Sequence, residues 1–179
     1  MAQCIALLRG INVGRAKRIA MADLRALMEN LGFRHVRTLL NSGNVVFDTP
    51  RPNPRKIAAT IEAAIEAHCG FTAAAIVMTA ATLQTAIAGN PIAHATKEPS
   101  KFLLGFAQDA DDLERLRALA EQDWKTEALA VGGAAAYIWC AEGVLASGVL
   151  KALGRRKDLT LTTRNWATVL KLQQMTSGA

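Results

Sequence analysis

Two short stretches of the chain combine glycines with polar side chains that could bind an anion. One follows the apolar run that ends at Leu8, and the other lies between two runs of β-favouring residues. A guanidinium pairs well with carboxylates and phosphates, and glycines let backbone N–H groups approach a ligand. The candidate ligand-binding residues are Arg9, Gly10, Asn12, Gly14, Asn41, Ser42, Gly43 and Asn44. They predict binding of a small anionic molecule, with phosphorylated molecules among the candidates. The competing interpretation is that Asn41, Ser42 and Asn44 only form a turn and that Arg9 pairs with an acidic residue.

Two further candidates are Arg164 and Asn165. The pattern predicts a helix over 163–175, started by a cap at Thr162 or Thr163, so that Arg164 falls in its first turn. A basic residue there opposes the helix dipole, which favours a role in contacting the same anionic ligand or a partner surface. The alternative is a solvated polar face behind a structural Trp166.

The sequence specifies no reaction, catalytic residue or cofactor. It contains neither a Gly-x-x-x-x-Gly-Lys-Ser/Thr phosphate loop nor the third glycine of a dinucleotide fingerprint. The three histidines and three cysteines are widely separated, so we predict no metal site and no disulfide framework. Whether the protein is an enzyme stays open at this point.

Positive charge is concentrated at the two ends of the chain. Residues 1–60 carry 10 Lys or Arg against 3 Asp or Glu, 61–142 carry 5 against 11, and 143–179 carry 6 against 1. Basic ends suit a nucleic-acid-binding or protein-interaction module, which is the alternative function. Nucleic acid is less favoured as a partner, because aromatic residues make up only 5% of the chain and 44–47 lacks an RNA-recognition signature.

No apolar run approaches the ~20 residues that a membrane-spanning helix needs. The apolar segment that ends at Leu8 is too short for a signal peptide. We therefore expect a cytoplasmic globular protein with no membrane partner.

The elements that must position the candidate residues follow an α+β order. Strands are predicted at 3–8, 36–40, 45–47 and 73–78, with helices at 21–31, 54–68 and 80–88. This is the βαββαβ order of a ferredoxin-like fold, with an antiparallel sheet. Its first and second strands run parallel, so the two polar stretches should meet at one sheet edge.

A similar order recurs after a linker at 89–100. Strands are predicted at 101–106, 127–131, 135–140 and 158–161, with helices at 110–122, 144–153 and 163–175. We therefore predict two ferredoxin-like halves packed together: 1–90 with the candidate ligand loops, and 101–179 with a closing C-terminal helix.

Several motifs resemble those of the bacterial family called domain of unknown function 1697. They are Leu7 to Gly14, Leu31 to Phe33, Val36 to Thr38, Ser42 to Phe47 and Thr163 to Trp166. The resemblance runs almost from end to end and implies an α+β protein of ferredoxin-like halves, without implying an activity, cofactor or partner. Two departures are Asn41, where the family usually has Gln, and 15–18, where a more Gly-rich run is expected.

Overall fold

The computed structural model describes residues 1–177 and divides the chain into two compact units. Among the described residues, the first unit comprises 1–81 and 174–177, and the second comprises 82–173. The boundary therefore falls inside the helix that begins at Ala80. The expected domain limits, 1–90 and 101–179, stay a prediction.

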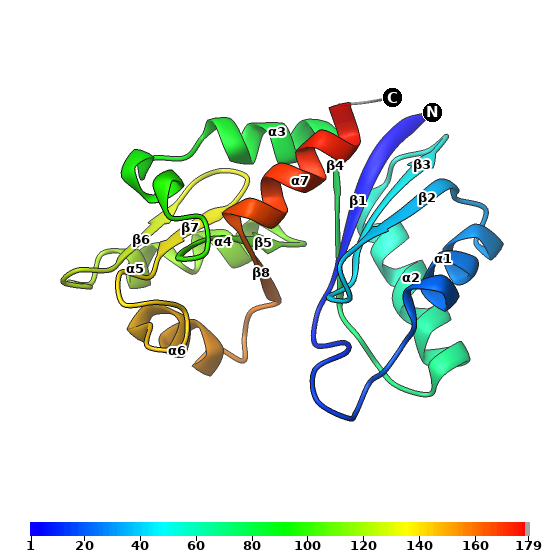
Figure 1. Cartoon of the computed structure of the whole chain (residues 1–179), viewed down its shortest axis with the longest axis horizontal. Coiled ribbons are helices and arrows are strands. Elements are labelled where there is room, and N and C mark those ends of the chain that lie inside the picture. Colours follow the sequence, from blue (N-terminus) through cyan, green and yellow to red (C-terminus); the bar gives the residue numbers. More distant parts are fainter. Residues whose placement is uncertain (178–179) are drawn as a thin grey trace. The chain divides into compact units, whose positions relative to one another are not determined.

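The first unit is built on a four-stranded antiparallel sheet in the order β2-β3-β1-β4 (Figure 1). Its elements are β1 (Ala2–Leu8), α1 (Met21–Asn30), β2 (Arg34–Leu39), β3 (Asn44–Thr49), α2 (Pro54–Cys69) and β4 (Ala75–Thr79), followed by α3 (Ala80–Ala88), most of which belongs to the second unit. The order and pairing are those of the ferredoxin-like plan, which confirms the predicted fold class.

The apolar residues of β1 are buried on both faces of the sheet. Cys4, Ala6 and Leu8 belong to the core that α1 and α2 complete, and Ile5 and Leu7 on the opposite face are also fully buried. An apolar strand without alternation predicts this double burial. The central strand is therefore a rigid support for the loop that follows it.

The second unit repeats the strand order, here as β6-β7-β5-β8. A 3-10 helix (Ala93–Lys97) precedes β5 (Phe102–Ala107), α4 (Ala110–Glu114), α5 (Arg117–Ala120), β6 (Ala128–Val131), β7 (Ala136–Trp139), α6 (Gly148–Arg155), β8 (Leu161–Asn165) and α7 (Trp166–Ser177). Leu113, Leu116 and Val149 pack with β5 and β7 residues in its core. The suspected duplication of topology is confirmed.

Three predicted elements of the second unit were wrong in extent. The single helix expected at 110–122 is divided, because the Leu116 N–H bonds to the Leu113 carbonyl in a tighter turn. The helix expected from Val144 begins at Gly148, because Ser147 caps it. The last strand lies at Leu161–Asn165 rather than at 158–161, since β-branched Thr162 and Thr163 pair with β5.

Within residues 1–177, we find no helix with both the length and the apolar character needed to cross a membrane.

Candidate functional site

The sheet of the first unit brings the two polar stretches to the same edge. β1 and β2 are each antiparallel to β3, so they run in the same direction and end together. Leu39, the last residue of β2, pairs with Asn44 at the start of β3, and the Leu8 N–H donates to the Gly43 carbonyl at 2.8 Å. The β1–α1 loop (9–20) and the β2–β3 turn (40–43) are therefore neighbours.

Asn12 joins these two segments through its side-chain amide. Its Nδ2 donates to the carbonyls of Ile19 and Asn41, and its Oδ1 accepts from the Ile19 N–H, all at 2.9 Å. The amide is thus committed to holding the loop and the turn in place. In this structure Asn12 positions the site rather than presenting its side chain to a ligand.

The β2–β3 turn is held from inside by Asn44, which is fully buried. Its Nδ2 donates to the Leu39 carbonyl at 2.8 Å and to Ser42 Oγ at 2.9 Å. Gly43 is required by space and by conformation: its φ is +79°, and an added Cβ would lie 2.6 Å from Leu8 Cβ. The turn therefore packs closely on the end of β1.

Left-handed backbone conformations cluster in these two segments. Positive φ occurs at Gly10, Gly14 and Gly43 and, at a steric cost, at Asn12 (55°) and Leu40 (60°). A bulky residue such as Leu rarely adopts this conformation in folded proteins. Strained backbone of this kind is concentrated at functional sites in proteins.

The N-terminus of α1 lies beside Asn12 and lacks a side-chain cap. Ala20 occupies the cap position, and the first helical bond runs from the Leu24 N–H to the Ala20 carbonyl. Among the described residues, the N–H groups of Met21, Ala22 and Asp23 have no acceptor. Unpaired N–H groups and the helix dipole together favour a negative group at this end.

A cavity of about 520 Å³ lies in this region. Its lining residues are Asn12, Arg18, Ile19, Ala20, Met21 and Asn41. The cavity therefore joins the β1–α1 loop, the β2–β3 turn and the α1 N-terminus in one hollow. Its volume lies in the range of small-molecule sites.

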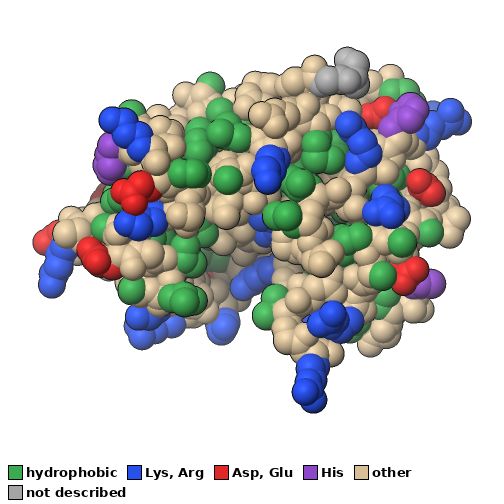
Figure 2. All heavy atoms as spheres, viewed as in Figure 1, with side chains coloured by type: hydrophobic (Ala, Val, Ile, Leu, Met, Phe, Trp, Pro, Cys, Tyr) green, Lys and Arg blue, Asp and Glu red, His purple; other side chains and the backbone are tan. Residues whose placement is uncertain are grey.

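The loop beside this cavity is strongly basic. Residues 9–20 contain Arg9, Arg15, Lys17 and Arg18, all exposed, and no Asp or Glu. Arg18 Nη1 donates to the Gly14 carbonyl at 3.0 Å and Lys17 Nζ to the Thr72 carbonyl at 2.9 Å, whereas the Arg9 guanidinium bonds to no residue within 1–177. Figure 2 shows Lys and Arg side chains protruding where Figure 1 places this loop.

Arg164 and Asn165 lie in the second unit and have different roles from those predicted. The expected position of Arg164 in the first turn of a helix was wrong, because Arg164 pairs with Leu104 as part of β8. Its Nη1 donates to Thr162 Oγ1 and to the Thr163 carbonyl, and burial lowers the pKa of Arg164 to about 10. Asn165 is the cap of α7, since its Oδ1 accepts from the Thr168 N–H at 2.9 Å.

The spacing of Arg164, Thr168 and Lys171 predicts one polar stripe on this helix, and that prediction was also wrong. Thr168 is buried, and Arg164 is not helical. Trp166, Val169 and Leu170 are the core positions that the pattern predicts; Trp166 and Val169 are buried, whereas Leu170 is only partly buried.

The cysteines do not add a reactive group to the site. Burial raises the pKa of the Cys4 thiol to about 11, with a further contribution from Asp48, and burial also raises the pKa of Cys140. Within the described part of the chain, no group of three or more His, Cys, Asp or Glu side chains could hold a metal ion.

Sequence reasoning missed Arg18 and the details of the α1 N-terminus. The signal for the second was present: Ala20 precedes the helix where Ser, Thr, Asp or Asn would normally cap it. Arg18 gave no such signal, because its place in the cavity depends on how Asn12 folds the loop.

Comparison with known proteins identifies a family and a similar solved structure. The structure of the conserved bacterial protein SP0830 from Streptococcus pneumoniae is similar over 98% of each chain, with a TM-score of 0.82 and 23% sequence identity. At this identity the likeness shows the fold. A search among curated proteins gave no significant match. The family model described as protein of unknown function (DUF1697) matches residues 1–137, so the chain belongs to this family.

Proposed function

We propose that this protein binds a small organic molecule with an anionic group, best a phosphate ester, in the cavity between the β1–α1 loop and the β2–β3 turn. The observation that carries the proposal is the position of the uncapped α1 N-terminus in that cavity, beside Arg18. A helix N-terminus and a guanidinium both favour a negative group, and here they face the same hollow.

The residues around the cavity divide into binding and positioning groups. Met21 and Arg18 line the cavity, so the Met21 N–H and the Arg18 guanidinium are the donors that we assign to the proposed anion. Arg9 supplies a further exposed guanidinium at the same sheet edge. Asn12 holds the loop against the turn, and Asn44 holds the turn itself.

Two exposed apolar side chains support an organic rather than an inorganic anion. Val13 is 74% exposed and Leu40 is 56% exposed. They adjoin Asn12 and Asn41, which are joined by a hydrogen bond and line the cavity. An apolar body attached to the anionic group could cover these side chains and remove their surface from water.

A thermal-shift screen of phosphorylated metabolites tests the proposal. A ligand at ~100 times its dissociation constant stabilises a protein by about 2.7 kcal/mol, which gives a clear rise in Tm. We expect the Arg18→Ala variant to lose most of that rise, because Arg18 lines the cavity. Arg51→Ala is the matched control, because Arg51 is also exposed but follows β3 at the opposite edge of the sheet.

Equal Tm shifts in the wild type and Arg18→Ala would show that the ligand binds elsewhere. A screen in which no organic phosphate raises the Tm of the wild type would contradict the proposal. The Tm values without ligand should be nearly equal in all three proteins, since exposed substitutions usually change stability by less than about 0.5 kcal/mol.

The basic loop also favours a second candidate function, binding of nucleic acid through its phosphates. Four exposed basic residues lie within 9–18. If a duplex is the partner, the logarithm of affinity should fall with the logarithm of salt concentration with a slope of about −0.9 for each phosphate neutralised. An affinity that does not change with salt concentration would exclude binding of nucleic acid through its phosphates.

A further inference from the structure

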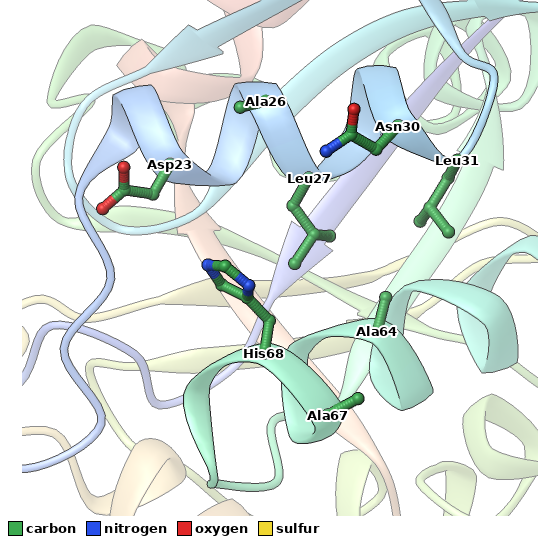
Figure 3. A pocket seen from close by; sticks show the side chains of 8 residues that line it. All are labelled: Asp23, Ala26, Leu27, Asn30, Leu31, Ala64, Ala67 and His68. Carbon is green, nitrogen blue, oxygen red and sulfur yellow. The ribbon is translucent and has the colours of Figure 1, made fainter.

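A second cavity, of about 460 Å³ and open to solvent, lies between α1 and α2 in the first unit (Figure 3). It is formed because small side chains face each other across the helix pair: Ala26 comes from α1, and Ala64 and Ala67 come from α2. Leu27 and Leu31 add the larger apolar surface. The lining is thus mainly apolar, and the volume suits a small molecule.

Polar groups converge at one end of this cavity. In Figure 3 the carboxylate of Asp23 and the imidazole of His68 lie at the same end, one from each helix. Neither side chain forms a hydrogen bond or an ion pair with a residue in 1–177. Both groups are therefore available to a ligand.

The negative charge of Asp23 also acts on the neighbouring thiol of Cys69. The pKa of the Cys69 thiol is raised by burial and, in addition, by Asp23. An anionic ligand in the cavity would meet the same repulsion, whereas a cation would be attracted. The polar end of the cavity therefore selects against the phosphate esters proposed for the other site.

We infer that this cavity binds a small molecule with an apolar body and a protonated amine. The ammonium group donates to the Asp23 carboxylate and to a ring nitrogen of His68, and the apolar body lies along the alanines and Leu27. Such a ligand uses both features of the lining, the apolar walls and the single carboxylate. The two sites meet at Asp23 but use different groups: the amine site uses the Asp23 carboxylate, whereas the anion site uses backbone N–H groups of the first turn of α1.

Phenethylamine and 2-phenylethanol are suitable probes, because they share an apolar body and differ in the charged group. The binding of each is followed by two-dimensional NMR of the ¹⁵N-labelled full chain. Phenethylamine should shift the amide signals of Ala26, Ala64 and Ala67 in a saturable way and bind more tightly than the alcohol. Asp23→Asn should weaken phenethylamine binding about fivefold, as expected for one charge pair in contact with water, and leave the alcohol unchanged.

Two variants of α2 test the location of binding. Ala67→Phe fills the cavity and should abolish binding of both probes. Ala63→Phe is the matched control, because Ala63 is exposed on the same helix and does not line the cavity. A native-like spectrum for each variant shows that the fold is retained.

Three results would overturn the inference. The first is the absence of saturable shifts with phenethylamine, and the second is equal binding of phenethylamine by Asp23→Asn and the wild type. The third is unchanged binding by Ala67→Phe.

Discussion

At the scale of single residues, the polar side chains that sequence reasoning selected for binding mostly hold the site in shape. Asn12, Asn44 and Asn165 each commit their amide to backbone partners within 3.0 Å. The groups left to contact an anion are guanidinium groups and backbone N–H groups. A polar residue in a loop motif therefore marks the place of this site without itself being the contact.

Asn12→Ala should destabilise the first unit. The change leaves the Ile19 N–H and the carbonyls of Ile19 and Asn41 without their partner, and an unsatisfied group costs roughly 1–3 kcal/mol. Urea unfolding measures the loss. Asn30→Ala is the control, because Asn30 is exposed and its side chain has no hydrogen bond to residues 1–177. Similar urea midpoints for Asn12→Ala and Asn30→Ala would show that the hydrogen bonds of the Asn12 side chain contribute little to stability.

Leu40→Asn should increase stability while reducing ligand affinity. The side chain of Leu40 is exposed, and its backbone has the left-handed conformation. Asn tolerates that conformation better than Leu, so the free energy of unfolding should rise by up to about 1 kcal/mol. Leu145→Asn is a control at a side chain that is 96% exposed without positive φ, and it should show no such gain. A stability loss in Leu40→Asn would contradict the assignment of strain to this position.

At the scale of elements, the two helices nearest the predicted sites start differently. α1 begins without a side-chain cap, and α7 begins with Asn165 as its cap. Because α1 has no side-chain cap, N–H groups of its first turn, beside the cavity between the β1–α1 loop and the β2–β3 turn, have no acceptor within residues 1–177. In α7 the cap accepts from the Thr168 N–H. This difference supports our proposal that an anion binds in the first unit and not at the start of α7.

Asn165→Ala should lower the free energy of unfolding by about 1 kcal/mol, the usual contribution of a helix cap. Thr163→Ala should cost less than half as much, because Thr163 lies in β8 and its hydroxyl caps nothing. The two variants can be compared by thermal unfolding. A larger loss of stability in Thr163→Ala than in Asn165→Ala would contradict the assignment of Asn165 as the cap and would favour the helix start that the sequence pattern predicted.

The sequence predicted those elements whose periodicity was strong. The β2–β3 hairpin, α1, α2 and α3 were found within a few residues of their limits, because apolar spacing and turn glycines marked them clearly. The failures occurred where local signals conflicted. Thr162 and Thr163 can cap a helix or extend a strand, and only pairing with β5 decides between these.

The candidate site was predicted in part for a similar reason. The βαββαβ order implied that the β1–α1 loop and the β2–β3 turn share an edge, and the strand pairing brings them together there. The cavity, the role of Asn12 and the position of Arg18 depend on how loop 9–20 folds back on itself. Side-chain hydrogen bonds of this kind leave no periodic signal in a sequence.

At the scale of the whole molecule, the two units share a strand order but differ at the connection after the first strand. The β1–α1 loop spans 9–20 and contains four basic residues. The equivalent connection between β5 and α4 is only 108–109 and is followed by the acidic residues Asp111 and Asp112. The duplicated architecture therefore provides the basic loop only in the first unit, where we propose that the anion binds.

The most direct test of that proposal is an NMR titration of the ¹⁵N-labelled full chain with phenyl phosphate, with phenol as the uncharged control. An anion at the α1 N-terminus accepts hydrogen bonds from unpaired N–H groups, so the amide signals of Met21, Ala22 and Asp23 should show the largest saturable shifts. Phenol should not reproduce them. No saturable shift at these three amides, or equal shifts with phenol, would contradict the account.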